Sequence, residues 1–146
     1  MGSSFTEYRG HGFWTRDGKL EIWLHELVCA VDRLPAPPDW LRQAREAWHL
    51  QATVGFGGCI DAGLDQWLGD QADRVVTLVG LAADALGHLR EQQVLRCEAL
   101  NSAGLGGQGA TWTRDLAVDV VVPVAQAFLD LLARRIEWDA STPPMV

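Results

Sequence analysis

Apolar residues recur along much of this chain at the three- and four-residue spacing that is typical of an α-helix. The first such stripe consists of Leu20, Trp23, Leu24, Leu27, Val28, Val31 and Leu34. This spacing puts the apolar side chains on one face of a helix. The helix is expected to begin at Asp17, whose carboxylate can cap free N–H groups, and to end before the prolines of 35–38.

Further helices are predicted after the prolines. One covers about 38–54, carries Trp48 on its apolar face and ends at the glycines of 55–58. A short helix is expected at about 60–68. The longest helix follows it, with Asp70 as its N-cap.

The remaining segments are less regular. The last helix is predicted from about 119 to 137, because Pro123 is tolerated only in a first turn. The pattern leaves two segments, 94–100 and 116–122, open between helix and extended chain. Residues 5–16 are aromatic and interrupted by glycine, which predicts a loop or a short extended piece.

Together these elements predict an all-α fold, a compact bundle of four to six helices with an extended or loop N-terminal segment. A length of 146 residues suits one domain with a sizeable core. A single helical domain is therefore expected over 1–146, with flexible ends at 1–4 and 141–146.

One short string occurs twice. Trp14-Thr-Arg-Asp17 recurs as Trp112-Thr-Arg-Asp115, and each copy stands before a predicted helix. We interpret both as helix entries, in which a tryptophan anchors the chain and the threonine and aspartate cap the first turn.

Composition and charge exclude several classes of protein. The net charge is −7 and the basic residues do not cluster, so nucleic acid is not expected as a partner. An acidic balance instead favours attraction to a basic protein. No apolar run approaches the ~20 residues that a membrane span needs, and no membrane association is expected. The three widely spaced cysteines indicate a reducing compartment, and we expect a cytoplasmic protein.

The sequence contains no clear catalytic set, and neither a cofactor nor a metal is expected. Gly104–Gly109 fits the GxGxxG string but lacks the strand and helix of a dinucleotide site, so a flexible loop is predicted there. The second glycine string, 55–58, is interpreted as a helix end and a tight turn. One alternative remains open: His25, His49 and His88 could converge inside a bundle, as in a small helical enzyme or a ligand- or metal-binding protein.

Negative charge is concentrated in one stretch. Asp61, Asp65, Asp70 and Asp73 lie within 13 residues and are opposed only by Arg74. An ordinary solvated surface, a divalent-cation site and an acidic interface are all compatible with this stretch.

For an interface, Trp67 or Trp40 would supply an aromatic anchor. A second candidate binding segment lies at the N-terminus. It comprises Tyr8, Arg9, His11 and Trp14.

The N-terminal run Glu7-Tyr-Arg-Gly-His-Gly-Phe-Trp14, followed by Asp17, Leu20-Glu21 and Trp23-Leu24, resembles the opening of small bacterial proteins associated with polymorphic toxin systems as immunity proteins. The resemblance covers about the first 30 residues. It implies a cytoplasmic protein that binds one cognate toxin domain, and it carries over no catalytic residue.

The sequence therefore predicts a protein-binding inhibitor rather than an enzyme. It would neutralise a cognate toxin by occluding its active or substrate-binding surface, steered by charge if the toxin is basic. A helical enzyme or ligand-binding bundle built on the three histidines is the first alternative. A dimeric regulatory or structural subunit with a tryptophan-rich face is the second.

Overall fold

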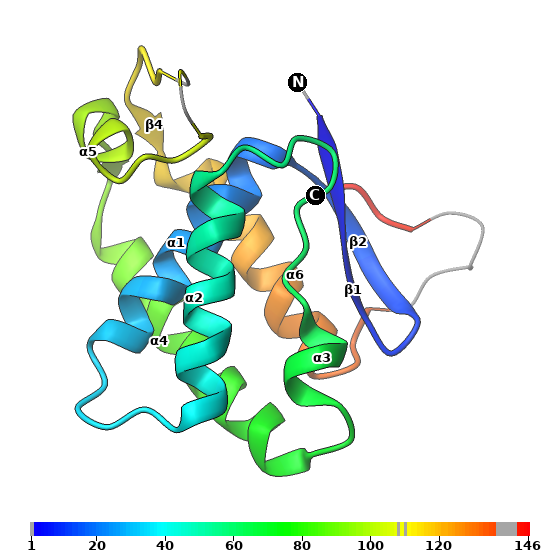
Figure 1. Cartoon of the computed structure of the whole chain (residues 1–146). Helices are drawn as coiled ribbons and strands as arrows, with labels where there is room; N and C mark the ends of the chain where they lie inside the picture. Colours follow the sequence, from blue (N-terminus) through cyan, green and yellow to red (C-terminus); the bar gives the residue numbers. More distant parts are fainter. Residues whose placement is uncertain (1, 108, 110, 137–142) are drawn as a thin grey trace.

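The computed structural model describes residues 2–107, 109, 111–136 and 143–146. Over these residues the chain forms six α-helices, one short 3-10 helix and two antiparallel two-stranded sheets (Figure 1). The prediction of an all-α bundle is wrong, because a β-hairpin stands beside the helices and the fold is mixed. In the described part of the chain, none of the helices is long and apolar enough to cross a membrane.

The hairpin occupies the segment that was expected to be a loop or extended piece. Strands β1 (Ser3–Tyr8) and β2 (His11–Arg16) pair antiparallel, with Tyr8 opposite His11. Only Arg9 and Gly10 connect them, and both have positive φ angles, 51° and 78°. Two-residue turns of this kind match the natural twist of paired strands.

The polarity of the inward-facing side chains explains why the pairing was not predicted. Ser4, Thr6 and Thr15 point into the protein and are at most 1% exposed. A half-buried strand is recognised by apolar residues at every second position. Here three of the inward positions are hydroxyl residues, so the apolar alternation is missing.

Four helices form the body of the protein. They are α1 (Asp17–Asp32), α2 (Asp39–Thr53), α4 (Ala72–Glu91) and α6 (Val122–Leu132). Helix α1 lies at the centre and packs against α2, α4 and α6, so it is buried well beyond the single apolar stripe that the sequence predicted. The short α3 (Leu64–Leu68) begins later than predicted, directly after the left-handed Gly63.

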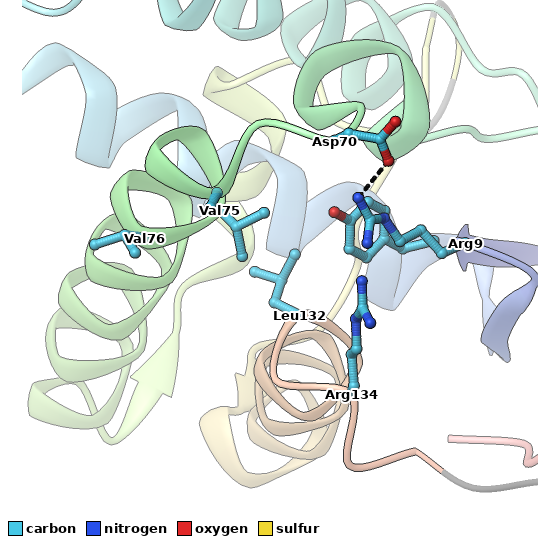
Figure 2. Close-up of a pocket in the computed structure, with 8 residues that line it drawn as sticks. Arg9, Asp70, Val75, Val76, Leu132 and Arg134 are labelled. Atoms are coloured by element: carbon cyan, nitrogen blue, oxygen red, sulfur yellow. Dashed lines mark hydrogen bonds and ion pairs between the residues drawn. The ribbon is translucent and has the colours of Figure 1, made fainter.

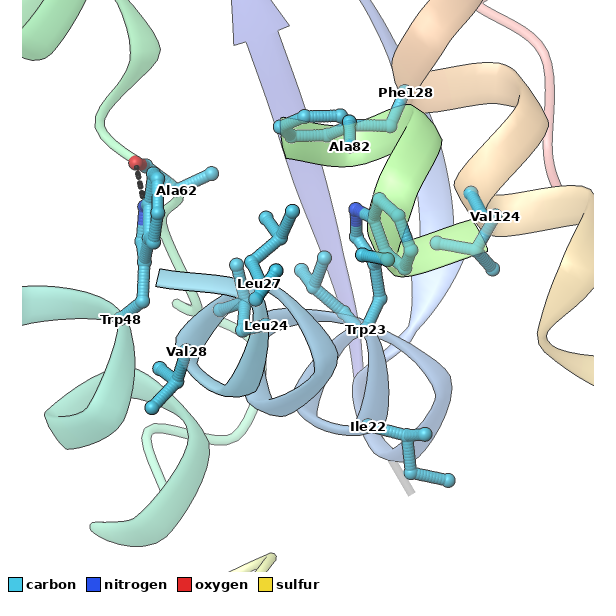
Figure 3. Packing of buried hydrophobic residues seen from close by; sticks show 14 of the residues in the cluster. Ile22, Trp23, Leu24, Leu27, Val28, Trp48, Ala62, Ala82, Val124 and Phe128 are labelled. Carbon is cyan, nitrogen blue, oxygen red and sulfur yellow. Dashed lines mark hydrogen bonds between the residues drawn. The ribbon is translucent and has the colours of Figure 1, made fainter. Parts of the chain in front are cut away.

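The buried apolar residues form one cluster across these elements. Trp23 and Trp48, both expected in the core, are fully buried. Figure 3 shows Trp23 among side chains of α4 and α6, where its ring meets Phe128 edge-on at 5.6 Å between centroids. Trp48 of α2 donates from Nε1 to the Ala62 carbonyl, in the loop before α3, at 2.8 Å (Figure 3).

Segments 94–100 and 116–122, which the sequence left open between helix and extended chain, each contain a short strand and a helical part. Strand β3 (Val94–Leu95) pairs with β4 (Leu116–Ala117), and α5 (Cys97–Ser102) lies between them. A 3-10 turn, η1 (Val118–Val120), then leads into α6, with Pro123 in its first turn. Helix α6 ends at Leu132, earlier than predicted, and residue 137 lies outside the described residues.

The C-terminal end of the described chain lies beside the hairpin, which itself contains the N-terminal end (Figure 1). Ser3 and Ser4 belong to β1. The Trp14 N–H donates to Pro144 O at 2.8 Å, and the Val146 N–H donates to Trp14 O at 2.7 Å. Residues 1, 141 and 142 of the predicted flexible ends lie outside the described residues.

Candidate functional site

The tip of the hairpin lies against the loop between α3 and α4. The Arg9 N–H donates to Asp65 Oδ1 at 3.0 Å, and the Arg9 guanidinium donates to Asp70 Oδ1 at 2.5 Å and to Gly69 O at 3.2 Å. The Tyr8 hydroxyl donates to the same carbonyl at 3.3 Å. The two segments proposed as separate binding candidates, the N-terminal segment and the acidic stretch, therefore meet in space.

Tyr8, Arg9 and Asp70 border a groove of about 310 Å³, here named the hairpin-tip groove. Its apolar wall comes from Val75 and Val76 of α4 and Leu132 of α6, and its rim carries Arg9, Asp70 and Arg134. Figure 2 shows the Arg134 side chain extending from the end of α6 toward Arg9. Val76 is 72% exposed, so a large apolar side chain stands open to solvent at this groove.

The acidic stretch holds the fold together as well as facing solvent. Asp65 and Asp70 fasten the hairpin tip, and Asp61 Oδ1 accepts from the Gly63 N–H at 2.8 Å in the turn before α3. Asp70 does not cap α4 as predicted, since Gln71 is the N-cap and makes no side-chain cap bond. Asp73 lies in the first turn of α4, where a negative charge suits the helix dipole.

Trp40 and Trp67, the proposed aromatic anchors, are tied to one arginine. The Arg74 guanidinium lies 5.1 Å from the centroid of the Trp40 ring and donates to the Trp67 carbonyl at 2.8 Å. Both tryptophans are partly buried and pack on the core. They brace the junction of α2, α3 and α4, and neither lines the hairpin-tip groove.

Trp14 and His11 are on the hairpin but do not line the groove either. Trp14 is 40% exposed on the outer face, where its ring lies 5.2 Å from that of its cross-strand partner Phe5. His11 is exposed at the start of β2. Of the N-terminal candidates, only Tyr8 and Arg9 therefore join the groove.

The three histidines do not form a ligand set. Burial and the neighbouring His49 lower the pKa of His25, whereas His88 lies 3.9 Å from Asp84 and 3.8 Å from Glu91 on its own helix. Within the described residues, one group of three potential metal ligands has its ligand atoms within 4.8 Å of one another. It consists of Cys97, Glu98 and Asp115. That group contains no histidine.

A second site was missed by the sequence reasoning, and it is here named the glycine pocket. The two glycine strings, about 50 residues apart in the sequence, lie against each other: a Cβ at Gly55 would lie 3.0 Å from Gly106 O. The Gly106 N–H also donates to Ala52 O, near the end of α2, at 3.0 Å. A Cβ at Gly107 would lie 2.7 Å from Val54 O, so only glycine allows this approach. Gly55 and Gly106 line a pocket of about 370 Å³ beside the start of α1.

Two buried acidic side chains, Asp17 and Glu21, line this pocket one helical turn apart. Burial, and next the charge of Asp17, raise the pKa of Glu21 from 4.5 to about 7, partly offset by the Gly106 N–H. The Asp17 carboxylate accepts from Ser4 Oγ at 2.6 Å and from the Gly58 N–H at 2.8 Å. The i, i+4 spacing of these acids was visible in the sequence, but it could not reveal that the glycine loops cover them.

The first copy of the repeated Trp-Thr-Arg-Asp string leads into a helix as predicted, whereas the second leads into β4, and in neither copy does the aspartate cap the helix that follows. Asp17 is the first residue of α1 and makes no cap bond. Asp115 instead accepts from the Cys97 N–H at 2.9 Å, at the start of the preceding helix α5. What the second copy does supply is Trp112, which lies over Gly18 in the glycine pocket.

Comparison with known proteins adds no family to this picture. A scan of protein-family models, a search of curated proteins and a search of solved structures each found no match to this chain. The function is therefore argued from the geometry of these two sites.

Proposed function

We propose that this chain is a protein-binding inhibitor of the immunity type, which docks on a toxin domain through the hairpin-tip groove. One observation carries the proposal. Tyr8, Arg9 and Asp70, three of the residues picked from sequence as partner-binding, come from segments some 60 positions apart and border the same groove.

Arginine is enriched at binding hot spots because it combines a large apolar body with a polar end. Arg9 supplies this residue at the groove, where its guanidinium lies 5.5 Å from the centroid of the Tyr8 ring, which is itself buried at 3% exposed. Val76 adds an exposed apolar surface beside them. Such a surface gains stability when a partner covers it.

The charges at the rim indicate what the partner presents. Arg9 is paired with Asp70, whereas Arg134 forms no ion pair with any residue that the structure describes. The groove therefore suits an apolar side chain with a carboxylate next to it. Over longer distances the net charge of −7 would steer the chain toward a basic partner.

Inhibition would be steric, because docking at the groove covers the partner's active or substrate-binding surface. The three cysteines are free thiols, which is in keeping with action in the cytoplasm.

Co-expression with the toxin domain encoded by the neighbouring gene tests the proposal. Growth is expected to be rescued, and the two proteins are expected to co-purify. Val76→Asp places a charge in the groove and should abolish both effects. Leu50→Asp is the matched control, since Leu50 is an exposed aliphatic residue on α2, 55% exposed and away from the groove.

Two results would overturn the proposal. One is a wild-type chain that neither rescues growth nor forms a complex. The other is equal loss of binding in Val76→Asp and Leu50→Asp, which would show that the groove is not the docking surface.

A further inference from the structure

We propose that the glycine pocket binds a small organic cation, a flat molecule whose amidine, guanidine or amine nitrogen pairs with Glu21 while its body lies against Trp112. This inference goes beyond the proposed function, since it concerns a different surface and a small ligand. The pocket lies at the start of α1, where the loop after α2 and the loop after α5 meet.

Glu21 is a buried acid with one unpaired oxygen. This residue is 6% exposed, and its Oε2 atom is buried without a hydrogen bond from any described residue. A buried carboxylate oxygen without a partner costs free energy. Asp17 differs, because Ser4 and Gly58 satisfy its oxygens. The Gly106 N–H lies close enough to the carboxylate to lower its pKa, but Oε2 of Glu21 is left open for a donor from outside.

The charged groups that line the pocket favour a cation over an anion. Asp17 and Glu21 are the acids of the pocket, and Arg16, which is exposed, is the cationic residue that lines it. The loop segments 54–58 and 103–107 contribute no ionisable side chain. An anion would meet two buried acids, whereas a cation would be attracted by both.

The size and the walls of the pocket suit a small flat molecule. A volume of about 370 Å³ lies in the range of small-molecule sites. Glycine backbone forms much of the wall, because Gly55, Gly57 and Gly106 all line the pocket. A flat ligand can approach such a wall closely, since no side chain projects from it.

Trp112 is held in place for this role. Its backbone N–H donates to Asn101 Oδ1 at 2.7 Å, and its carbonyl accepts from Asn101 Nδ2 at 2.9 Å. Its indole Nε1 donates to Leu105 O at 3.3 Å. A cation beside an aromatic face is attracted by the ring, and a ring that is already fixed loses little freedom on binding.

Glu21 offers two modes of binding with opposite pH dependence. With a pKa near 7 it can pair with a cation as a carboxylate, or donate a hydrogen bond to a neutral ligand as an acid. Cation binding requires the carboxylate, so the affinity should rise by about tenfold between pH 6 and pH 8. Binding through the neutral acid would weaken over the same range.

Calorimetric titration of the full chain with benzamidine, and with the neutral benzamide of nearly the same shape, tests the inference. At pH 8, benzamidine is expected to bind at least about tenfold more tightly than benzamide. At pH 6, its binding is expected to release a proton from Glu21. Glu21→Gln, close to isosteric, should remove this preference and the proton release. Glu91→Gln is the control, since Glu91 lies far along α4 with a side chain that is 77% exposed.

Trp112→Leu supplies a second variant and should weaken benzamidine binding about fivefold or more. Equal affinity for the two probes would overturn the inference, as would binding that weakens from pH 6 to pH 8 or survives unchanged in Glu21→Gln. Val76→Asp should bind benzamidine as the wild type does, so failure here and failure of the groove proposal can be told apart.

Discussion

The backbone N–H of Arg9 donates to the carboxylate of Asp65 at 3.0 Å, across 56 positions of sequence. This bond fastens the hairpin turn to the first turn of α3. It shows that an aspartate chosen as a partner-binding residue already has a partner within the fold. A contribution of this residue to binding must therefore be separated from its contribution to stability.

We expect Asp65→Ala to destabilise the protein by about 0.5–1 kcal/mol, because the Arg9 N–H loses its acceptor at an exposed position. Urea unfolding followed by circular dichroism measures the change. Asp119→Ala is the control, since Asp119 is exposed on η1 and its side chain bonds to none of the described residues. Equal losses in the two variants would show that the bond to Arg9 contributes nothing.

The two fully buried tryptophans should respond differently to the same substitution. Trp48 Nε1 is bonded to Ala62 O, whereas Trp23 Nε1 has no acceptor among the described residues. Trp48→Phe leaves a buried carbonyl unpaired, while Trp23→Phe removes an unpaired donor. Trp48→Phe should therefore cost about 1–2 kcal/mol more in unfolding free energy. Denaturant titration of both variants decides this, and a larger loss at Trp23 would contradict it.

The helical part of the fold could be predicted because apolar periodicity and breakers agree there. Asp17 and the prolines of 35–38 bounded α1 closely, and the α2 boundary was placed within a residue or so. The hairpin could not be predicted in the same way. Its inward side chains are polar, and its turn is Arg-Gly instead of the Asn-Gly that marks such turns in a sequence.

The candidate sites depended on contacts that a single sequence does not contain. Tyr8, Arg9 and Asp70 were each picked out, but only folding brings the hairpin tip to the loop before α4. The glycine strings were interpreted one at a time, as a flexible loop and as a helix end. Their joint role with Glu21 depends on long-range packing, which local composition cannot show.

The raised pKa of Glu21 predicts that stability falls as the pH rises. The folded protein holds this proton up to about pH 7, whereas the unfolded chain releases it near 4.5. Between these values the folded state binds more protons, so the unfolding free energy decreases with pH and levels off above about 7. The full effect is on the order of 3 kcal/mol.

Glu21→Gln should remove this slope, so the variant gains stability over the wild type as the pH goes from 5 to 8. Urea unfolding at several pH values, with Glu91→Gln as the control, measures the difference. Burial also raises the pKa of Glu26. Glu26 contributes to the pH dependence of stability in the wild type and in both variants alike, so its contribution cancels when they are compared. A constant difference between Glu21→Gln and wild type across the range would contradict the assignment.

The glycines of α4 offer a stability gain. A Cβ built at Gly80 or at Gly87 meets nothing within 4 Å, so neither glycine is needed for close packing. Each lies inside a helix, where alanine is favoured over glycine by about 1 kcal/mol. Gly80→Ala and Gly87→Ala should each raise the melting temperature, and their effects should add because the residues are two turns apart.

Gly12→Ala is the contrasting variant. A Cβ there would lie 1.9 Å from the Thr6 carbonyl oxygen, so β2 would have to move away from β1. This variant should lower the melting temperature, because the backbone has to shift. Calorimetric scans of the three variants and the wild type measure the expected increase in melting temperature at Gly80 and Gly87 and the expected decrease at Gly12. A lower melting temperature for Gly80→Ala or Gly87→Ala would contradict the prediction that neither glycine is needed for packing.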